Sequence, residues 1–263
     1  MSRIRNLLAA RKRRTLLIPF FTSGYPTRAA SVDLVKLALD AGADMVELGM
    51  PFSDPMADGP EIQFSSQIAL NRGHTMPDLI RTVNEVRAYS KAPLILMGYY
   101  NPVLAFGVET FATTVAEAGG DGLIIPDLPV EEASELAHPA EKAGLSMVYL
   151  VAPTSSCERI ATVDRKATDL VYAVTVTGVT GGRTGFQRDT VSYLKSLMKQ
   201  LTKPFVAGFG VSSPETARQL AKYADGVVIG SALIHAFRTA SNRKAGYRAV
   251  EKLLTGIRKN LDR

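Results

Sequence analysis

The chain has one cysteine, Cys157, among its 263 residues. A single thiol excludes an internal disulfide, and the sequence has no metal-ligand spacing of the kind that zinc or iron sites use, so we expect no bound metal. Cys157 lies at the expected start of a helix, and we interpret it as a structural thiol.

Long apolar runs are also missing. No run approaches the roughly 20 residues that a membrane-spanning helix needs. The run Leu16–Phe21 follows a basic segment, but it is too short for the core of a signal peptide and has no small-residue cleavage site. The sequence therefore predicts a cytoplasmic protein that makes no use of a membrane.

Charge of one sign is in modest excess, with a formal net charge of +6. The basic residues crowd the two ends of the chain, namely Arg3, Arg5, Arg11, Lys12, Arg13 and Arg14 at one end and Arg258, Lys259 and Arg263 at the other. We expect these to be solvated faces, so nucleic acid is not an indicated partner. A modest positive bias also suits an anionic substrate.

The chain is rich in short apolar runs separated by amphipathic, helix-length segments. Continuous apolar runs are typical of strands buried on both faces, and βα alternation favours parallel pairing. Eight runs occur, which are Thr15–Phe21, Met45–Leu48, Pro93–Gly98, Gly122–Ile125, Ser146–Val151, Leu170–Val174, Phe205–Gly208 and Gly226–Ile229. They predict an α/β fold, a single (β/α)8 TIM barrel that spans residues 1–263 as one domain. A short extra N-terminal helix and a short helix after the eighth strand complete this prediction.

The residues before these runs alternate in charge. The even-numbered runs start at aspartates (Asp44, Asp121, Asp169 and Asp225), whereas a lysine or arginine precedes the odd-numbered ones. This periodicity indicates a repeated βαβα unit, although polar helix ends can produce it by chance. An open doubly wound sheet is the alternative architecture, but no Gly-x-Gly-x-x-Gly follows the first run.

Three carboxylates lie at or after the end of the second run. Glu47 lies at its end, and Asp54 and Asp58 come in a loop that contains three prolines. An ionised acid out of water costs several kcal/mol unless it is paired or neutralised. Acids held against an apolar wall acquire the separated pKa values that acid and base roles require. The alternative is that Glu47 pairs with a basic residue and the loop is ordinary structure.

Three glycine-bearing segments, Thr177–Gly182, Gly208–Ser212 and Gly230–Ala232, occur late in the chain. Glycine lets backbone N–H groups approach an anion, and a helix N-terminus adds favourable partial charge. In TIM barrels phosphate commonly binds after strands seven and eight. Together the segments predict a phosphate site, with Ser231 also capping the following helix, although tight turns would explain any one of them. The loop Thr177–Asp189 is either a substrate lid or a surface loop.

Six motifs occur in order along the chain: Ile18–Pro26, Val46–Pro60, Met97–Pro102, Asp121–Glu132, Val176–Gly181 and Gly208–Glu215. With these motifs the chain resembles tryptophan synthase alpha subunits nearly from end to end. The second motif, Val-Glu-Leu-Gly-Met-Pro-Phe-Ser-Asp-Pro-Met-Ala-Asp-Gly-Pro, is highly specific, whereas the glycine segments alone are not.

The resemblance implies cleavage of indole-3-glycerol phosphate to indole and glyceraldehyde 3-phosphate. It also implies an alpha2-beta2 tetramer in which a beta subunit carries pyridoxal phosphate and receives the indole, with no cofactor on this chain. Catalysis would fall to Glu47 and Asp58. The implied substrate contacts are Phe20, Ile62, Tyr99, Tyr172 and Thr180, and the implied phosphate contacts are Gly181, Gly210, Gly230 and Ser231.

One departure from the family pattern is visible. The family usually has Gly-Asp-Pro after the first strand, and this chain has Gly24-Tyr25-Pro26. The change leaves Glu47 and Asp58 intact but bears on loop detail and partner contacts. Three alternatives remain: another phosphate-binding barrel enzyme, a catalytically weak regulatory subunit, and a standalone indole-releasing lyase. Decarboxylating or ring-closing synthases usually need a lysine at a strand end, and the eight expected strand ends have none.

Overall fold

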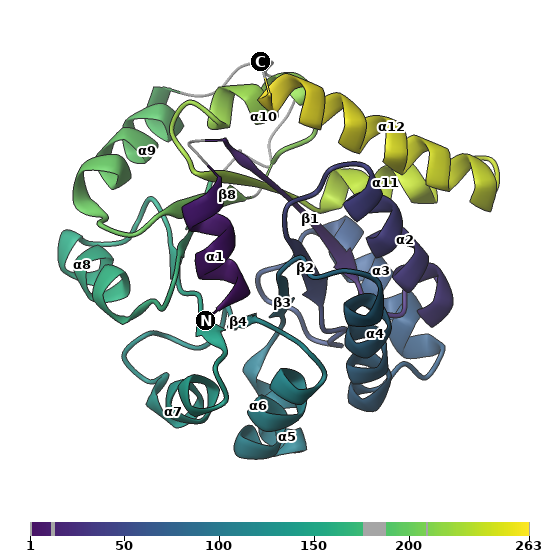
Figure 1. Cartoon of the computed structure of the whole chain (residues 1–263), viewed down its shortest axis with the longest axis horizontal. Coiled ribbons are helices and arrows are strands. Elements are labelled where there is room, and N and C mark those ends of the chain that lie inside the picture. Colours follow the sequence, from purple (N-terminus) through teal and green to yellow (C-terminus); the bar gives the residue numbers. More distant parts are fainter. Residues whose placement is uncertain (1, 12–13, 176–187, 209, 263) are drawn as a thin grey trace.

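Parallel strands form the centre of the protein (Figure 1). The structure is a computed structural model that describes residues 2–11, 14–175, 188–208 and 210–262. Within these residues nine strands make one sheet, in the order β5-β4-β3-β2-β1-β9-β8-β7-β6. Their bounds are β1 Leu16–Thr22, β2 Val46–Gly49, β3 Leu94–Met97, β4 Gly122–Ile124, β5 Ser146–Met147, β6 Leu150–Val151, β7 Val171–Val174, β8 Phe205–Gly208 and β9 Gly226–Ile229.

The fifth apolar run closes the sheet into a barrel. It forms β5 and β6, the two ends of the strand order, which are separated by only Val148 and Tyr149. The N–H of Val148 donates to the carbonyl of Leu123 in β4 at 3.0 Å, and Tyr149 accepts from the N–H of Tyr172 in β7 at 2.9 Å. All eight apolar runs therefore form strands, and the predicted (β/α)8 barrel is confirmed over the open doubly wound sheet.

Helices surround the barrel (Figure 1). They are α1 Arg3–Ala10, α2 Arg28–Asp40, α3 Pro60–Asn71, α4 Met76–Tyr89, α5 Tyr100–Phe106, α6 Val108–Glu117, α7 Ser134–Lys142, α8 Cys157–Lys166, α9 Arg188–Gln200, α10 Pro214–Leu220, α11 Ser231–Arg238 and α12 Arg243–Leu261. The two extra helices expected from the sequence are α1 and α11. None of the helices in the described ranges is long and apolar enough to cross a membrane.

Two helices were not expected, and both lie beside the carboxyl ends of the strands. Helix α3 begins at Pro60, whose missing N–H costs nothing in the first turn of a helix. Helix α5 is short, and the carboxylate of Asp127 accepts the N–H of Tyr100 at its start, at 3.0 and 3.2 Å. Asp127 therefore has a structural role at the start of α5.

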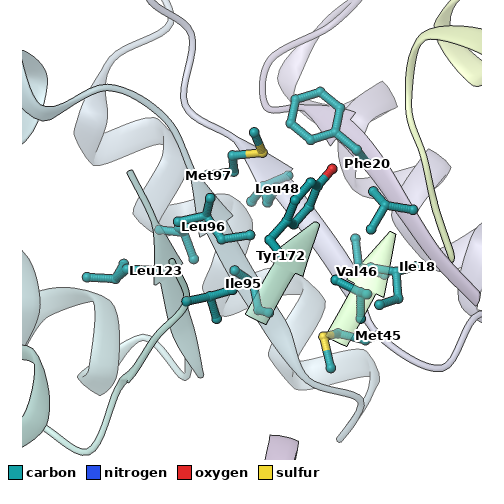
Figure 2. Packing of buried hydrophobic residues seen from close by; sticks show 14 of the residues in the cluster. Ile18, Phe20, Met45, Val46, Leu48, Ile95, Leu96, Met97, Leu123 and Tyr172 are labelled. Carbon is teal, nitrogen blue, oxygen red and sulfur yellow. The ribbon is translucent and has the colours of Figure 1, made fainter. Parts of the chain in front are cut away.

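The strand register brings a carboxylate into the barrel core. Phe20 of β1 is opposite Glu47 of β2, and Glu47 is opposite Ile95 of β3. Residues in register across neighbouring strands point to the same face of a sheet. Figure 2 shows Phe20 and Ile95 among the packed side chains of this core, together with Tyr172. Glu47 therefore has apolar neighbours on both sides.

The aspartates that precede the even-numbered runs bond to the strand before them. Asp44, Asp121 and Asp225 accept the backbone N–H groups of Leu17, Leu94 and Phe205, each at 2.8 Å. Asp169 instead accepts the hydroxyl of Ser146 at 2.5 Å. The charge alternation in the sequence thus corresponds to a contact repeated between pairs of neighbouring strands.

Basic residues near both ends of the chain pair with these aspartates. The pairs are Arg3–Asp121 at 2.9 Å, Arg5–Asp169 at 2.9 Å, Arg11–Asp225 at 2.5 Å, Arg14–Asp44 at 2.7 Å and Arg258–Asp44 at 2.9 Å. The expectation of solvated faces was wrong for Arg11 and Arg258, whose side chains are mostly covered, whereas Arg3, Arg5 and Arg14 remain substantially exposed in spite of their ion pairs. Helix α1, which carries Arg3 and Arg5, lies across the barrel opening (Figure 1). Lys12, Arg13 and Arg263 lie outside the described residues.

We expect Arg87→Ala to lower the free energy of unfolding by about 2–3 kcal/mol. The Arg87 side chain is 14% exposed, bonds Asp121 at 2.6 Å, and donates to the carbonyls of Gly119, Ser90 and Ala92. Its removal leaves buried acceptors without their donor. Urea denaturation measures the change.

Arg81 on the same helix provides the control, since its side chain is 63% exposed and its ion pair among the described residues is with Asp78, three residues away. Arg81→Ala should change stability by less than about 1 kcal/mol. Equal effects of the two substitutions would show that the Arg87 bonds add little.

Candidate active site

A cavity of about 180 Å³ opens at the carboxyl ends of the strands. It is lined by eight of the eleven residues that the sequence assigned to a site: Phe20, Glu47, Asp58, Ile62, Tyr172, Gly210, Gly230 and Ser231. Tyr99 lines a smaller adjoining cavity that shares Phe20, Asp58 and Ile62. Thr180 and Gly181 lie outside the described residues. Of the expected lid Thr177–Asp189, only Arg188 and Asp189 are described, and both belong to α9.

Glu47 is a buried acid at the floor of this cavity. The residue is 1% exposed, and its Oε2 atom has no hydrogen-bond partner within the described part of the chain. Burial disfavours the carboxylate and raises the pKa of Glu47 to about 8. Pairing with a basic side chain, the alternative left open by the sequence, is not seen in the described ranges. The Glu47 carboxyl is therefore largely protonated at neutral pH, and its pKa is close to the value that suits a general acid.

The raised pKa of Glu47 predicts a pH-dependent stability. The pKa rises from an ordinary 4.5 to about 8 on folding, so between these values the unfolded chain releases a proton that the folded chain keeps. The Glu47 contribution to stability is then fully present below pH 4.5, decreases as the pH rises to about 8, and is constant above it. The Glu47→Gln side chain does not titrate. The free energy of unfolding of this variant minus that of the wild type should therefore increase as the pH rises through this window.

Urea denaturation from pH 5 to pH 9 tests this expectation, with the exposed Glu131→Gln as the matched control. Wild-type and Glu47→Gln curves that run parallel over this range would contradict the raised pKa.

Asp58 lies in the loop before α3 and is half-buried. Burial raises the pKa of its carboxyl, and a hydrogen bond from Tyr99 opposes this effect. The Tyr99 hydroxyl also accepts the N–H of Ala57 at 2.9 Å, and the Tyr99 ring stacks on Phe52 at 5.2 Å between centroids. Tyr99 thus anchors the Asp58 loop as well as lining the pocket.

Tyr172 of β7 lines the same cavity as the two acids. Figure 2 shows its hydroxyl pointing toward Phe20. A Cβ atom at residue 208 would lie 1.9 Å from this oxygen, so Gly208 leaves the space in which the ring lies. Burial, followed by the charges of Glu47 and Asp58, raises the pKa of Tyr172 well above its ordinary value. The hydroxyl therefore stays protonated and is a hydrogen-bond donor.

The opposite end of the cavity is suited to an anion. Gly210 has φ of +86°, a conformation that favours glycine, and Gly230 packs against Phe20, where a Cβ would approach within 3.2 Å. Ser231 is the first residue of α11, whose opening N–H groups have no intrahelical acceptors. The expectation that Ser231 caps this helix was wrong, because Gly230 occupies the cap position.

Sequence reasoning missed other lining residues, including Met97, Ser212 and Val228. Met97 lies two residues after Ile95 on β3, so the strand period of two places both on the inner face and was a usable signal. Ser212 belongs to the glycine segment already noted. No group of three or more acidic, histidine or cysteine side chains suited to a metal occurs among the described residues.

The fold and this site define an enzyme of the TIM-barrel class, with its candidate site at the carboxyl ends of the strands. Within that class, the chain belongs to the tryptophan synthase alpha chain family, whose model matches residues 7–261. It is a lyase of the kind that catalyses the alpha reaction.

Relatives and solved structures agree with this assignment. The chain is 45% identical over 260 residues to the tryptophan synthase alpha chain of Geobacter sulfurreducens, covering 98% of each chain. It is similar to a crystal structure of the alpha chain from Legionella pneumophila, with a TM-score of 0.92 and 35% identity over 100% of this chain and 98% of that one. A chain of the aminoacrylate-bound tryptophan synthase from M. tuberculosis gives a TM-score of 0.87 and 32% identity over 99% of this chain and 100% of that one.

Proposed function

We propose that this chain cleaves indole-3-glycerol phosphate to indole and glyceraldehyde 3-phosphate by a retro-aldol reaction, with residues 1–263 acting as one barrel domain. The observation that carries the proposal is Glu47, a fully buried acid that faces the same cavity as Asp58 and the glycine-lined anion end. This arrangement supplies an acid, a counter-charge and an anchor within one small volume.

Glu47 moves the protons in this mechanism. Cleavage requires a proton at indole C3, and the glycerol hydroxyl next to the breaking bond must lose its proton. Because the pKa of Glu47 is about 8, the acid can donate at neutral pH and then accept the hydroxyl proton as the C–C bond breaks. One proton enters at carbon and one leaves oxygen, so Glu47 is returned to its starting state.

Asp58 offsets the positive character that develops on the indole nitrogen when C3 is protonated. A carboxylate that accepts the N–H bond stabilises this charge most strongly in a site with little water. Tyr99 donates to Asp58 and helps to keep it in the position for this role. The buried Tyr172 hydroxyl orients the substrate or Glu47.

The remaining contacts bind the two ends of the substrate. Phe20, Ile62 and Tyr99 form the apolar wall for the indole ring, and Gly210, Gly230 and Ser231 bind the phosphate at the start of α11. Thr180 and Gly181 are assigned here by their place in the family motif, with Thr180 bridging to Asp58 and Gly181 contacting phosphate.

We also propose a beta subunit as the partner, in an alpha2-beta2 tetramer located in the cytoplasm. Pyridoxal phosphate belongs to the beta subunit in this family, and the indole would pass to it. A surface feature that supports the proposal is Met56, which is 86% exposed two residues before Asp58, with the 46% exposed Leu104 also on the surface. An apolar side chain exposed to this degree on the Asp58 loop would be covered when a partner binds there.

Indole release from indole-3-glycerol phosphate, measured with and without a tryptophan synthase beta subunit, tests the function. Slow release that increases sharply with the beta subunit would support both the reaction and the complex. Fast release by this chain alone would identify a standalone lyase. No indole under either condition would refute the proposal in favour of a regulatory subunit or another phosphate substrate.

A further inference from the structure

Glu61 joins two helices that contribute to the candidate site. It lies in the first turn of α3, three residues after Asp58. Its carboxylate accepts two bonds from the Arg238 guanidinium, at 3.0 and 2.8 Å, and contacts Nδ1 of His235 at 3.0 Å. Both partners belong to α11, the helix whose first residue, Ser231, lines the anion end of the cavity.

Aromatic packing holds this junction in place. The Arg238 guanidinium lies over the Phe64 ring, 4.9 Å from its centroid, so the same side chain bonds Glu61 and stacks on α3. Tyr25 packs edge-on against Phe64 at 6.1 Å and against Phe237 at 6.2 Å. Tyr25, the residue that departs from the family pattern, is therefore a buried wedge between α3 and α11.

The geometry of the Glu61–Arg238 contact distinguishes it from an ordinary surface ion pair. Most exposed pairs contribute little, but a bidentate guanidinium–carboxylate contact with stacking fixes both groups in a single orientation. The Glu61 side chain is 21% exposed and that of Arg238 is 38% exposed, so the contact is partly shielded from water. It can therefore transmit a change in position from one helix to the other.

We propose that Glu61 is a positioning residue that couples the phosphate end of the cavity to Asp58. The chain is restrained on both sides of Asp58. Before it, the N–H of Ala57 bonds the Tyr99 hydroxyl, and after it comes the first turn of α3, which Glu61 ties to α11. An anion bound at the start of α11 orders that helix, and Arg238 and His235 carry the restraint to α3 and so to Asp58. The inference rests on the proposed function, because it assigns the coupling to substrate phosphate.

A fluorescence experiment tests the coupling without any turnover. The sequence has no tryptophan, so Met56→Trp places a single tryptophan, excited selectively over the tyrosines, in the Asp58 loop. Inorganic phosphate should shift its emission in this parent and in Met56→Trp/Glu85→Gln, but shift it much less in Met56→Trp/Glu61→Gln. Glu85 is the matched control because its bond to Arg28 also joins two helices, α2 and α4, that do not line the cavity.

A kinetic experiment tests the consequence for cleavage. Glu61→Gln should lower kcat about tenfold or more while its melting temperature stays near that of Glu85→Gln, because a misplaced Asp58 costs rate rather than fold. The swapped pair Glu61→Arg/Arg238→Glu should recover part of the loss. Three results would overturn the coupling. They are an equal emission shift with phosphate in Met56→Trp and both double variants, no shift in any of the three, or a kcat of Glu61→Gln equal to that of Glu85→Gln. Absence of indole release from the wild type would instead refute the proposed function, and the fluorescence result would still decide the coupling.

Discussion

Glu47→Gln should abolish nearly all cleavage of indole-3-glycerol phosphate while the barrel remains folded. Glutamine has nearly the same shape as the protonated Glu47 side chain, which is the form favoured by burial, so packing is preserved. It has no exchangeable carboxyl proton to give to indole C3. Loss of a general acid typically costs about 10²–10⁴ in rate, and we expect kcat to fall within this range with KM little changed.

Indole release under single-turnover conditions measures the effect on chemistry, and circular dichroism measures folding. Glu131→Gln, an exposed residue outside the cavity, is the control and should behave as the wild type. Turnover within tenfold of the wild type in Glu47→Gln would remove Glu47 from the mechanism.

Asp58→Asn should lower kcat by about 10²–10³. The amide keeps an oxygen that accepts the indole N–H, but it lacks the negative charge that offsets the developing positive charge on nitrogen. Burial already raises the pKa of Asp58, so the neutral substitution carries no desolvation cost and the loop should remain in place. Phosphate binding at Gly230 and Ser231 should therefore persist.

Asp54→Asn provides the matched control, since Asp54 is an exposed carboxylate of the same loop that does not line the cavity. Its kcat should be within about twofold of the wild type. Isothermal titration with inorganic phosphate separates binding from catalysis. Loss of folding and phosphate binding together in Asp58→Asn would identify Asp58 as a structural anchor of the loop.

The barrel was predictable from sequence because its strands are buried on both faces. Such strands are continuous apolar runs, and all eight were found within a few residues of their observed bounds. The site was predictable for a related reason. Polar residues such as Glu47 that end an apolar run must lie where parallel strands end together, which is the face where barrels place their active sites.

Features that depend on long-range contacts were not predictable. The aspartate alternation was visible, but the N-terminal arginines that pair with Asp121, Asp169 and Asp225 are more than one hundred residues away from them. Helix α3 was missed because its sequence begins with glycine and proline and continues a proline-rich loop. The junction at Glu61 depends on α11, 174 and 177 residues further along the chain, and no local pattern indicates it.

The arginines across the barrel opening have a consequence for synthesis of the chain. Arg11 and its partner Asp225 are separated by 214 residues, so the segment made first bonds to one made near the end. At translation rates of about 5–20 residues per second, α1 must wait roughly 10–40 s before Asp225 has been made. During this interval some of the arginines at the N-terminus lack the aspartates with which they pair. The barrel opening that α1 covers is therefore completed last, although α1 is the first helix to be synthesised.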